Sequence, residues 1–569
     1  MTTDDLTGEI QKLALQNALE HDGKTSEKII LAKILGQMPE MRGKIKEIMP
    51  EIASVVQKVN NSTKESQRFD VQRLFPELLE KSKKTHSPQK PLLAPLENAI
   101  DGKVVTRFPP EPNGYPHIGH AKAAIINEEY AKMYNGKLIL RFDDTNPRAE
   151  RLEYYAAIKV GLDWLNIKYN SVKNTSDDME LMYEKGKNMM ELNRAYVCTC
   201  KQENIKNNRM NRIACKCSKR DQDLEDWDMM FTKIKPGKGI VRFRGDMNSD
   251  NTVMRDPVLF RIVDEKHPLV GDKYRVWPSY DFAVAIEDSA DGITHAFRTK
   301  EYELRNELYY TILDILEMRK PIMSEFSRLE FDGMPVSKRI LRPLIEDGKV
   351  SWYDDPRLPT LEALRRRGMR PEGIRKFIAS LGLTKADTLA PFDALESFNR
   401  KHVDKTSIRL FMVTEPVLIK ISGSPEKIEI SNHPTGDMGK RTVEVGGQVY
   451  LAKEDLQNIA PGTQIRLIGL GNISINKISD HVTAEYVGDT KDSSVIKVQW
   501  VPKMNSHKIK VIIPKILFIN DSFNEDSLEE KYAYTEPEFL NLEEGSEIQF
   551  VRFGYCRKDS QNQVIFTHK

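Results

Sequence analysis

The chain has few of the features that mark secreted and membrane proteins. Only five cysteines occur in 569 residues, too few for the disulfide framework of a secreted fold. No run of about 18 consecutive apolar residues is present, which argues against a transmembrane helix. The first residues, MTTDDLTGEI, are acidic where a secretory signal would be basic and then apolar. We therefore expect a cytoplasmic protein without a membrane partner.

An excess of charge of one sign is also missing. The sequence has 86 Lys and Arg against 84 Asp and Glu, a formal net charge of +2, so any surface that binds RNA must come from local clusters of basic residues. Charged residues make up 30% and hydrophobic residues 39%, which is an ordinary globular composition. A chain of this length exceeds one hydrophobic core, and we expect about three to five domains.

The first half of the chain shows helical and then alternating patterns. Residues 1–80 have helical periodicity, and a polar, Pro-containing stretch predicts a linker over residues 81–100. Over residues 101–195 a strand, a helix and a second strand follow one another, with a long helical stretch from Tyr154 to Asn193. This βαβ unit predicts the first half of a doubly wound parallel sheet of Rossmann-like type.

The second half completes that sheet and then changes character. Residues 196–275 predict an inserted mixed domain, and residues 276–350 predict the second half of the sheet. Helical periodicity returns over residues 351–400. Short alternating strands over residues 401–569 predict one or two β-barrels. The predicted fold class is thus multidomain α/β plus β.

The most informative segment is TRFPPEPNGYPHIGH, residues 106–120, at the turn between a predicted strand and a predicted helix. His117 and His120 lie three residues apart at the helix start, so both can face a phosphate held above the turn. Gly119 would let the backbone come close. The pair would stabilise charge that develops on the α-phosphate of ATP, without covalent catalysis. Taken alone, an H-x-x-H pair could also be a solvated helix face or two metal ligands.

The full segment resembles the HIGH signature of class I aminoacyl-tRNA synthetases, in the form used by glutamyl and glutaminyl enzymes. LRFDDTNP, residues 140–147, resembles the next block of the same enzymes. The turn FDGMP and the residues after it resemble the KMSKS loop, with Lys338 as a mobile cation for the ATP phosphates. Pro335 stands at the place of the first lysine of that consensus. The resemblance implies ATP binding by Pro110, Glu111, Pro112, Asn113, Gly114, Gly119, Val336, Ser337, Lys338 and Arg339.

The segment from Val276 to Tyr310 resembles the amino-acid pocket of this family. Glutamate and glutamine are nearly isosteric, so charge must separate them: a guanidinium binds a γ-carboxylate through two hydrogen bonds but leaves donors unpaired against an amide. Arg298 stands where glutamyl enzymes carry arginine and glutaminyl enzymes a small uncharged residue. Alternatively, Arg298 could pair with Glu301 or Glu303.

The same resemblance implies three further contacts with glutamate. Arg107 would hold the α-carboxylate, Glu111 would meet the α-amino group, and Tyr280 would line the side-chain pocket. Each could instead belong to the packing at the strand ends.

Two short motifs remain. Cys198, Cys200, Cys215 and Cys217 form a C-x-C, fourteen residues, C-x-C array, which suits one structural Zn²⁺ and could otherwise be four reduced cysteines in a loop. LRRRGMRPEGIRK, residues 364–376, resembles the part of the family that contacts the tRNA stem. This implies phosphate contacts by Arg365, Arg366, Arg367 and Arg370, although basic helix faces are often merely solvated.

The resemblance covers the chain from about residue 100, and the β-barrel ending is similar to that of archaeal and eukaryotic-cytosolic glutamyl-tRNA synthetases. It implies a glutamate–tRNA ligase that uses ATP and Mg²⁺, forms glutamyl adenylate and charges tRNA(Glu), with no DNA partner. The alternatives are a glutaminyl-tRNA synthetase, separated by Arg298, and a non-catalytic tRNA-binding scaffold, which would not need His117, His120 and Lys338.

Overall fold

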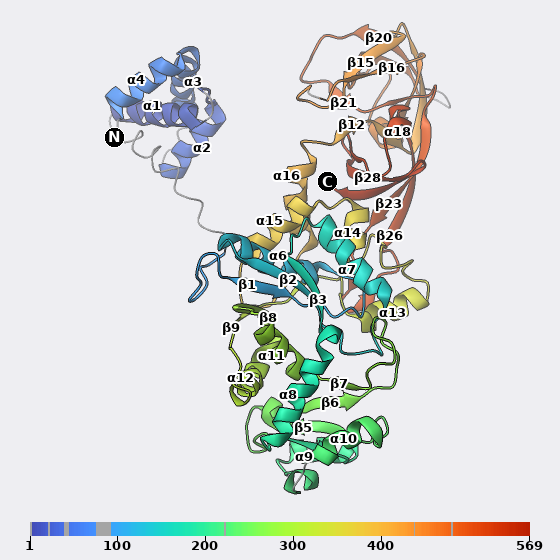
Figure 1. Ribbon diagram of the computed structural model, residues 1–569. Helices are drawn as coiled ribbons and strands as arrows, with labels where there is room; N and C mark the ends of the chain where they lie inside the picture. The colour runs from blue at the N-terminus through green and yellow to red at the C-terminus, as the bar shows by residue number, and fades with distance from the viewer. Residues whose placement is uncertain are drawn as a thin grey trace. The chain divides into compact units, whose positions relative to one another are not determined.

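The computed structural model consists of two compact units, Met1–Leu92 and Leu93–Lys569 (Figure 1). It describes residues 3–20, 23–38, 45–75, 93–220, 224–436, 438–478 and 482–569. Most of the predicted linker, residues 81–92, lies outside these ranges. None of the helices in the described ranges has the length and apolar character needed to cross a membrane.

The first unit is helical. Its helices are α1 (Thr3–Glu20), α2 (Glu27–Gln37), α3 (Ile45–Asn61) and α4 (Lys64–Leu74). They pack through fully buried side chains such as Ile10, Ile34 and Ile52. Thr63 begins α4 as its N-cap, because its hydroxyl accepts a hydrogen bond from the Ser66 amide at 3.2 Å.

The second unit begins with a parallel sheet. Its strands β1 (Val105–Phe108), β2 (Lys137–Phe142) and β3 (Ser171–Asn174) are adjacent in that order, and α6 (Ile118–Met133) and α7 (Leu152–Trp164) connect them. The parallel pair β8 (His295–Thr299) and β9 (Ile322–Phe326) continues beside β1. Thr294 joins the two pieces, since its amide donates to the Val105 carbonyl at 2.9 Å. The predicted parallel sheet is confirmed.

The predicted helix from Tyr154 to Asn193 is wrong. The chain forms two helices, α7 and α8 (Met179–Glu191), with β3 between them. Asn166, just after α7, has a left-handed φ of 57°, a conformation that asparagine tolerates and that ends helices. The helical pattern of the sequence did not separate α7 from α8.

An antiparallel sheet is inserted between the halves of the parallel one. It contains β4 (Ala195–Cys198), β5 (Ile240–Phe243), β6 (Val258–Ile262) and β7 (Val276–Pro278), in that order. Helices α8, α9 (Gln202–Met210) and α10 (Leu224–Thr232) belong to the same region. Gly186 lets α8 approach closely, because a Cβ there would lie 2.7 Å from the rings of Phe260 and Trp227.

Helices precede, connect and follow the two strands of the second half of the parallel sheet. α11 (Tyr280–Ala290) precedes β8, and α12 (Asn306–Ile315) lies between β8 and β9. After β9 come α13 (Lys338–Glu346), α14 (Leu361–Arg367), α15 (Pro371–Leu381) and α16 (Phe392–Val403), with the parallel pair β10 (Leu329–Phe331) and β11 (Thr388–Ala390). Gly368 has a φ of 94° and ends α14. The basic run over residues 364–376 is therefore divided between two helices.

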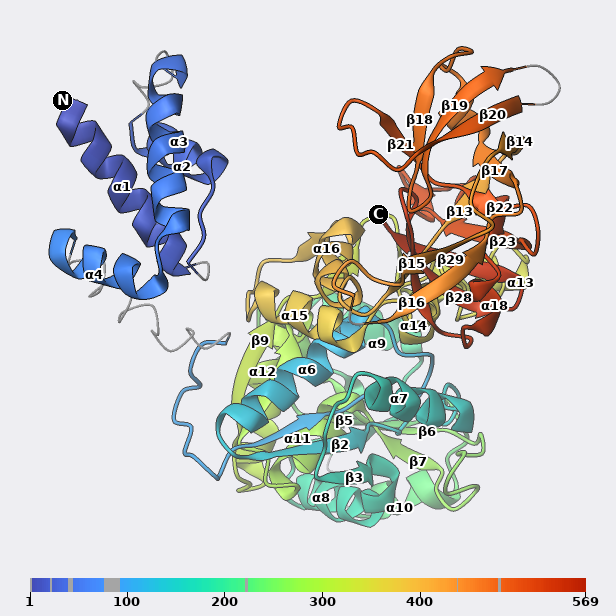
Figure 2. The ribbon, with the colours of Figure 1, turned by 90° about the horizontal axis from the view of Figure 1, so that it is seen from above.

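The C-terminal part contains two seven-stranded sheets that follow a nested order (Figures 1 and 2). The first sheet has the order β12-β27-β28-β29-β23-β26-β13 and the second has the order β21-β18-β19-β20-β14-β17-β22. The chain therefore starts one sheet with β12 (Ile408–Leu410) and β13 (Met412–Thr414), builds the other, and returns to finish the first. The remaining strands of the first sheet are β23 (His507–Pro514), β26 (Leu528–Thr535), β27 (Glu547–Phe550), β28 (Gly554–Ser560) and β29 (Gln563–His568). Those of the second are β14 (Pro416–Ser422), β17 (Gln448–Ala452), β18 (Gln464–Leu467), β19 (Gly471–Lys477), β20 (Val482–Gly488), β21 (Ile496–Val498) and β22 (Val501–Pro502).

A hairpin from the first of these sheets reaches the parallel-sheet region. It is formed by β24 (Phe518–Ile519) and β25 (Ser522–Phe523). The Phe518 amide donates to the Gly333 carbonyl at 2.9 Å, and Leu517 is fully buried beside Leu341 and Leu344 of α13. The C-terminal sheet thus contacts the turn that precedes the Lys338 loop.

Candidate functional site

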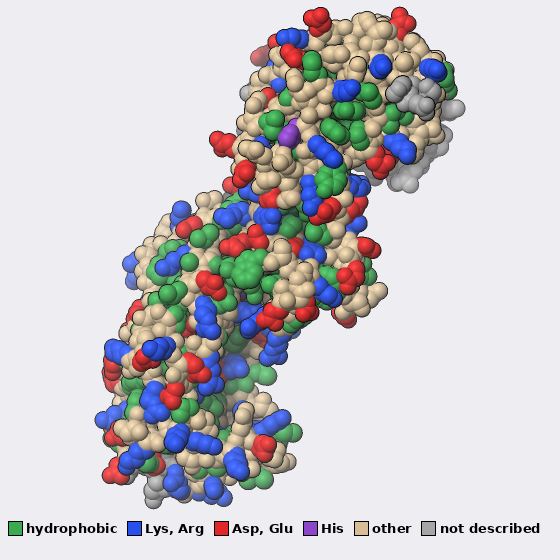
Figure 3. All heavy atoms as spheres, turned by 90° about the vertical axis from the view of Figure 1, so that its right-hand side faces the viewer, with side chains coloured by type: hydrophobic (Ala, Val, Ile, Leu, Met, Phe, Trp, Pro, Cys, Tyr) green, Lys and Arg blue, Asp and Glu red, His purple; other side chains and the backbone are tan. Residues whose placement is uncertain are grey.

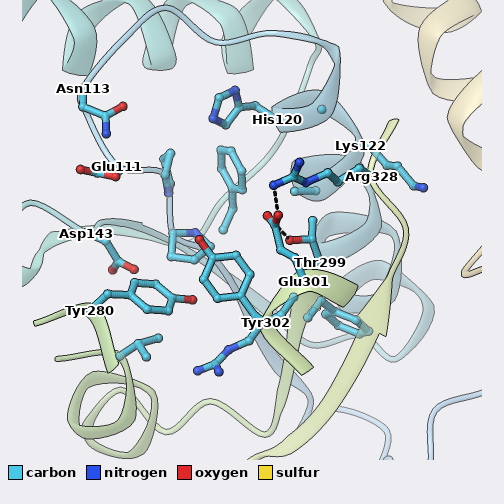
Figure 4. Close-up of a pocket in the computed structure, with 18 of the residues that line it drawn as sticks. Glu111, Asn113, His120, Lys122, Asp143, Tyr280, Thr299, Glu301, Tyr302 and Arg328 are labelled. Carbon is cyan, nitrogen blue, oxygen red and sulfur yellow. Dashed lines mark hydrogen bonds and ion pairs between the residues drawn. The ribbon is translucent and has the colours of Figure 1, made fainter. Parts of the chain in front are cut away.

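A cavity of about 630 Å³ opens at the carboxyl ends of β1, β2 and β8. Its lining comes from the turns after β1 and β2, from α11, from the residues after β8 and from the loop before α13 (Figure 4). Of the ten residues predicted to bind ATP, seven line it: Pro110, Glu111, Asn113, Gly119, Val336, Ser337 and Lys338. Pro112, Gly114 and Arg339 are outside the lining. The sequence motifs thus converge on one space, as parallel strands require.

The histidine pair is held by backbone hydrogen bonds at the start of α6. His117 Nδ1 accepts from the Gly119 amide at 3.1 Å, and His120 Nδ1 accepts from the His117 amide at 3.2 Å. A neutral ring whose Nδ1 accepts must carry its proton on Nε2. Both rings line the cavity, with centroids 4.0 Å apart. The arrangement supplies two Nε2–H donors fixed by the fold.

We expect these imidazoles to stay neutral throughout the physiological range. Burial, the neighbouring ring and the Lys338 ammonium lower the pKa of His117, and burial and Lys338 lower the pKa of His120 to about 4. Because of the lowered pKa, each imidazole stays neutral to a lower pH than a free histidine does. The rate of adenylate formation should therefore show no inflection near pH 6.5. Single-turnover rates between pH 5.5 and 8 test this.

A matched variant separates a neutral donor from a cation. His120→Asn keeps a neutral N–H donor, so it should retain more of the rate than His120→Ala does. The contrary result is a wild-type rate that rises as the pH falls through about 6.5, together with a His120→Asn rate that does not. It would show that the charged imidazole is the active form.

Lys338 closes the cavity from the opposite half of the sheet. Its Nζ donates to the Asn113 carbonyl at 2.7 Å and also contacts Asn113 Oδ1. Gly114 makes this approach possible, because a Cβ there would lie 2.4 Å from Lys338 Cε. Gly114 was predicted to bind ATP, but it does not line the cavity; in the structure it leaves space for the side chain of Lys338.

Arg298 is buried with unused hydrogen-bond donors. Its side chain is 5% exposed, lines the cavity and packs over the rings of Tyr309 and Tyr280, at 4.6 and 5.8 Å. Its Nε and Nη2 are buried and make no hydrogen bond within the described ranges. The alternative partners are engaged elsewhere, since Glu301 pairs with Arg328 and Glu303 with Lys385. Unpaired buried guanidinium donors are costly, and a carboxylate in the cavity would satisfy them.

Arg107 belongs to the lining of the cavity, but its donors are bonded within the protein. Its guanidinium is fully buried, with Nε and Nη2 bonded to the two Asp288 oxygens at 2.9 and 3.2 Å and Nη1 bonded to the Phe297 carbonyl at 2.9 Å. Burial alone would raise the pKa of Asp288, but Arg107 and Arg141 lower it to about 2. These contacts favour the alternative interpretation of Arg107, packing at the strand ends, over a bond to the α-carboxylate.

The sequence analysis missed Asp143. This carboxylate lines the cavity beside Tyr280 and Glu111 (Figure 4), and Arg141 Nε holds it at 3.0 Å. It stands directly after β2, at the edge where parallel strands present ligand-binding side chains. Its position after the strand could have identified it. Tyr302, Thr299 and Arg328 also line the cavity, and none was singled out.

The four cysteines converge in the inserted region. Neighbouring Sγ atoms lie 3.5 to 3.7 Å apart, and all four lie within 4.8 Å of one another. Four thiolates about 2.3 Å from a tetrahedral zinc ion would be about 3.8 Å apart. The ligand set and the spacing therefore fit zinc.

The basic run is largely engaged inside the protein. Arg366 binds Asp559 at 3.0 and 2.8 Å, and Arg370 binds Glu547 at 2.6 Å, both through two hydrogen bonds to the C-terminal sheet. Arg367 is buried against Glu396, while Arg365 is exposed. Arg366, Arg367 and Arg370 hold α14 and α15 in place, a role that the sequence analysis did not assign. Phosphate contact is easiest for Arg365, which is exposed.

Comparison with known proteins agrees with the site. Residues 103–405 match a model described as tRNA synthetases class I (E and Q), catalytic domain, and residues 407–489 and 497–559 match two anti-codon binding domains of the same class. A glutamate–tRNA ligase of Nitrosopumilus maritimus is 62% identical over 569 residues, which is 100% of both chains. The chain belongs to the glutamate–tRNA ligase family.

Further relatives extend over the whole length. The glutamate–tRNA ligase of Cenarchaeum symbiosum is 56% identical and covers 99% of this chain and 100% of its own, and that of Pyrococcus furiosus is 38% identical with the same coverage. The prediction of a glutamate–tRNA ligase of the archaeal type is confirmed, and so is the presence of anticodon-binding domains. Neither the glutaminyl alternative nor the scaffold is supported.

Proposed function

We propose that the cavity activates glutamate with ATP. The observation that supports this most directly is the buried guanidinium of Arg298, whose Nε and Nη2 have no hydrogen-bond partner among the residues that the structure describes. The γ-carboxylate of glutamate would accept hydrogen bonds from these two donors. An amide offers one acceptor oxygen and would place N–H groups against these donors. Arg298 thereby selects glutamate over glutamine.

The α-amino end of glutamate would lie near carboxylate side chains of the cavity. Asp143 and Glu111 face the same part of the cavity as Tyr280 (Figure 4), and an ammonium group placed there would gain charge-assisted hydrogen bonds. We assign the α-amino group to Asp143, which Arg141 fixes in place, with Glu111 nearer to Asn113 and Lys338. The α-carboxylate is then directed toward the histidine pair.

The chemistry needs positioning and charge stabilisation only. An α-carboxylate oxygen of glutamate attacks the α-phosphorus of ATP, and the bond to the β-phosphate oxygen breaks to release pyrophosphate. The Nε2–H groups of His117 and His120 donate to oxygens that gain charge, and Lys338 follows the leaving phosphates. In the second step a terminal ribose hydroxyl of the tRNA attacks the acyl carbon and AMP leaves.

Mg²⁺ should enter with ATP, because one lysine and two neutral imidazoles leave most of the phosphate charge uncompensated. Glu111 is the carboxylate on that side of the cavity (Figure 4), and it would be the protein ligand. For the tRNA stem, we propose that Arg365 contacts the phosphates.

We further propose that the cysteine cluster binds one structural zinc ion in the inserted domain. Purified protein should contain about one zinc per chain, and Cys200→Ser should lose most of it, because three thiolates bind far more weakly than four. Elemental analysis measures the metal, and limited proteolysis should show faster cleavage of the inserted region. A cluster of reduced cysteines suits a reducing compartment such as the cytoplasm.

Cys556 provides the matched control. It is buried in the C-terminal sheet, outside the cluster, so Cys556→Ala should leave the zinc content unchanged. Zinc absent from protein that was purified without chelators, or equal in Cys200→Ser and wild type, would contradict the site.

Aminoacylation tests the whole assignment. Wild-type protein is incubated with ATP, Mg²⁺ and total tRNA, with labelled glutamate or labelled glutamine, and Lys338→Ala is run alongside. We expect glutamate alone to be esterified, and charging by the variant to be about 10²- to 10³-fold slower. Charging with glutamine would overturn the role of Arg298, and tRNA binding without charging would support a scaffold.

A further inference from the structure

A buried polar cluster lies beside the turn that follows β2. Its members Asp144, Glu150 and His267 are all buried. The two acids belong to the turn, whereas His267 comes from the loop between β6 and β7 of the inserted sheet, 123 residues from Asp144. Many Lys and Arg side chains of the inserted region instead face solvent, as the lower part of Figure 3 shows. Buried polar groups are costly unless they are bound, so the hydrogen bonds of the cluster indicate its role.

Backbone hydrogen bonds fix the imidazole of His267. Its Nδ1 accepts from the amides of Leu269 and Val270, both at 3.2 Å. A ring whose Nδ1 accepts hydrogen bonds is neutral and carries its proton on Nε2. The ring also stacks on Trp277, with centroids 5.0 Å apart. The loop therefore presents one N–H donor in one orientation.

This donor points at the backbone of the turn. Nε2 donates to the Asp144 carbonyl at 3.1 Å and lies 3.0 Å from Oε2 of Glu150. Oε1 of Glu150 accepts from the Asn146 amide at 2.6 Å. A second residue of the inserted sheet, Arg261 on β6, donates to the Thr145 carbonyl at 3.0 Å. The inserted sheet thus holds three successive residues of the turn by their backbone groups.

The turn presents side chains to the cavity. Asp143, Thr145 and Asn146 line it, whereas His267 is outside the lining. Figure 4 shows the Asp143 carboxylate beside Tyr280, so a shift of the turn would move this carboxylate within the cavity. A cluster that only filled space could be apolar at lower cost. Hydrogen bonds to backbone groups, by contrast, set the position of the turn itself.

We propose that His267 is a positioning residue for glutamate, which fixes the turn that presents Asp143 to the α-amino group. The inference rests on the proposed function in taking Asp143 as the ligand of that group. It makes the inserted domain a part of the amino-acid site, although His267 itself does not touch the substrate.

Two substitutions of His267 separate positioning from the folding of its own loop. His267→Gln keeps an N–H donor near the place of Nε2 but loses the acceptor for the loop amides, whereas His267→Asn keeps this acceptor and is too short to reach the turn. His267→Asn should raise KM for glutamate about 10- to 100-fold, with kcat and KM for ATP within about threefold. His267→Gln should restore most of the loss. Initial rates of tRNA(Glu) charging with varied glutamate measure these constants.

Asp143→Asn shows whether the effect passes through the carboxylate. It should itself raise KM for glutamate, and His267→Asn should then add less than about twofold, because both changes act through one group. Lys266→Gln is the matched control in the same loop. It breaks an exposed pair with Asp272, at 3.1 Å, and should leave KM within about twofold.

Several results would overturn the inference. A KM for His267→Gln that is as high as that for His267→Asn would mean that the histidine only shapes its loop. Losses of His267→Asn and Asp143→Asn that multiply in full would mean that His267 does not act through Asp143. An unchanged KM in His267→Asn, with a raised KM in Asp143→Asn, would remove the role of His267 alone. An unchanged KM in Asp143→Asn would remove the assignment of the α-amino group as well.

A second variant serves if His267→Asn proves misfolded by circular dichroism. Glu150→Gln places an amide N–H group against either the His267 donor or the Asn146 amide, so one contact of the cluster is lost in both orientations. It should raise KM for glutamate as His267→Asn would. An unchanged KM in this variant decides against the positioning role.

Discussion

Replacing Arg298 by methionine should lower kcat/KM for glutamate by about 10²- to 10³-fold, because a charged, two-bond contact inside a closed site contributes about 3–4 kcal/mol. The same change should leave the thermal midpoint equal or higher. Without substrate, Arg298 is 5% exposed and its Nε and Nη2 have no hydrogen-bond partner in the described part of the chain, so its charge is a cost to stability that methionine removes. Initial rates with varied glutamate and a thermal melt measure both effects.

The opposite signs of these two effects make the test specific. A residue with only a packing role would lose stability and activity together. Arg298→Lys adds a second comparison, since it keeps the charge but loses the planar fork that matches a carboxylate. A kcat/KM for Arg298→Met within about tenfold of wild type would contradict the assignment of the γ-carboxylate to Arg298.

Removing the Lys338 ammonium should lower kcat by about 10²- to 10³-fold with little change in KM for glutamate. The lysine acts where charge develops as pyrophosphate leaves, so its contribution is made in the transition state rather than in glutamate binding. Single-turnover formation of glutamyl adenylate in Lys338→Ala measures this directly. The matched control is Arg342→Ala, which removes an exposed cation of the same helix that pairs with Glu346 at 2.8 Å.

Gly114→Ala should displace the Lys338 ammonium without removing it. The added methyl would occupy the space of Lys338 Cε, 2.4 Å away, and would displace the ammonium without deleting it. We expect a loss of about tenfold in kcat, smaller than for Lys338→Ala and not additive with it, because both changes act through one group. Full additivity of the two losses would show that Gly114 acts elsewhere.

The long-range contacts explain which parts of the site sequence reasoning reached. His117, His120 and Gly119 lie within one local turn, so their spacing alone places both rings at the start of α6. Asp143 directly follows β2, so its position at the carboxyl edge of the predicted parallel sheet could have identified it as well. Arg107 was expected to bind substrate, because the sequence does not show that Asp288, far away in the chain, occupies its donors.

The basic run illustrates the same limit. The arginines of residues 364–376 were expected to contact tRNA phosphates, yet Gly368 ends the helix, and Arg366 and Arg370 bind Asp559 and Glu547. These acids lie in strands of the C-terminal sheet, and no local pattern relates them to the helix. Opposite charges that are distant in sequence can be paired only once the fold is known.

The sequence by itself determined the family, the nucleotide motifs, the four cysteines and the change from α/β to all-β structure, because each depends on residue types at short spacing. Tertiary structure alone decided three features: the burial of Arg298 at the cavity with two donors that no described residue binds, the nested order of the two C-terminal sheets, and the contact of the β24–β25 hairpin with Gly333. Each of these depends on which distant segments pack together. That choice is made by the burial and hydrogen bonding of the whole chain, which short-range patterns do not encode.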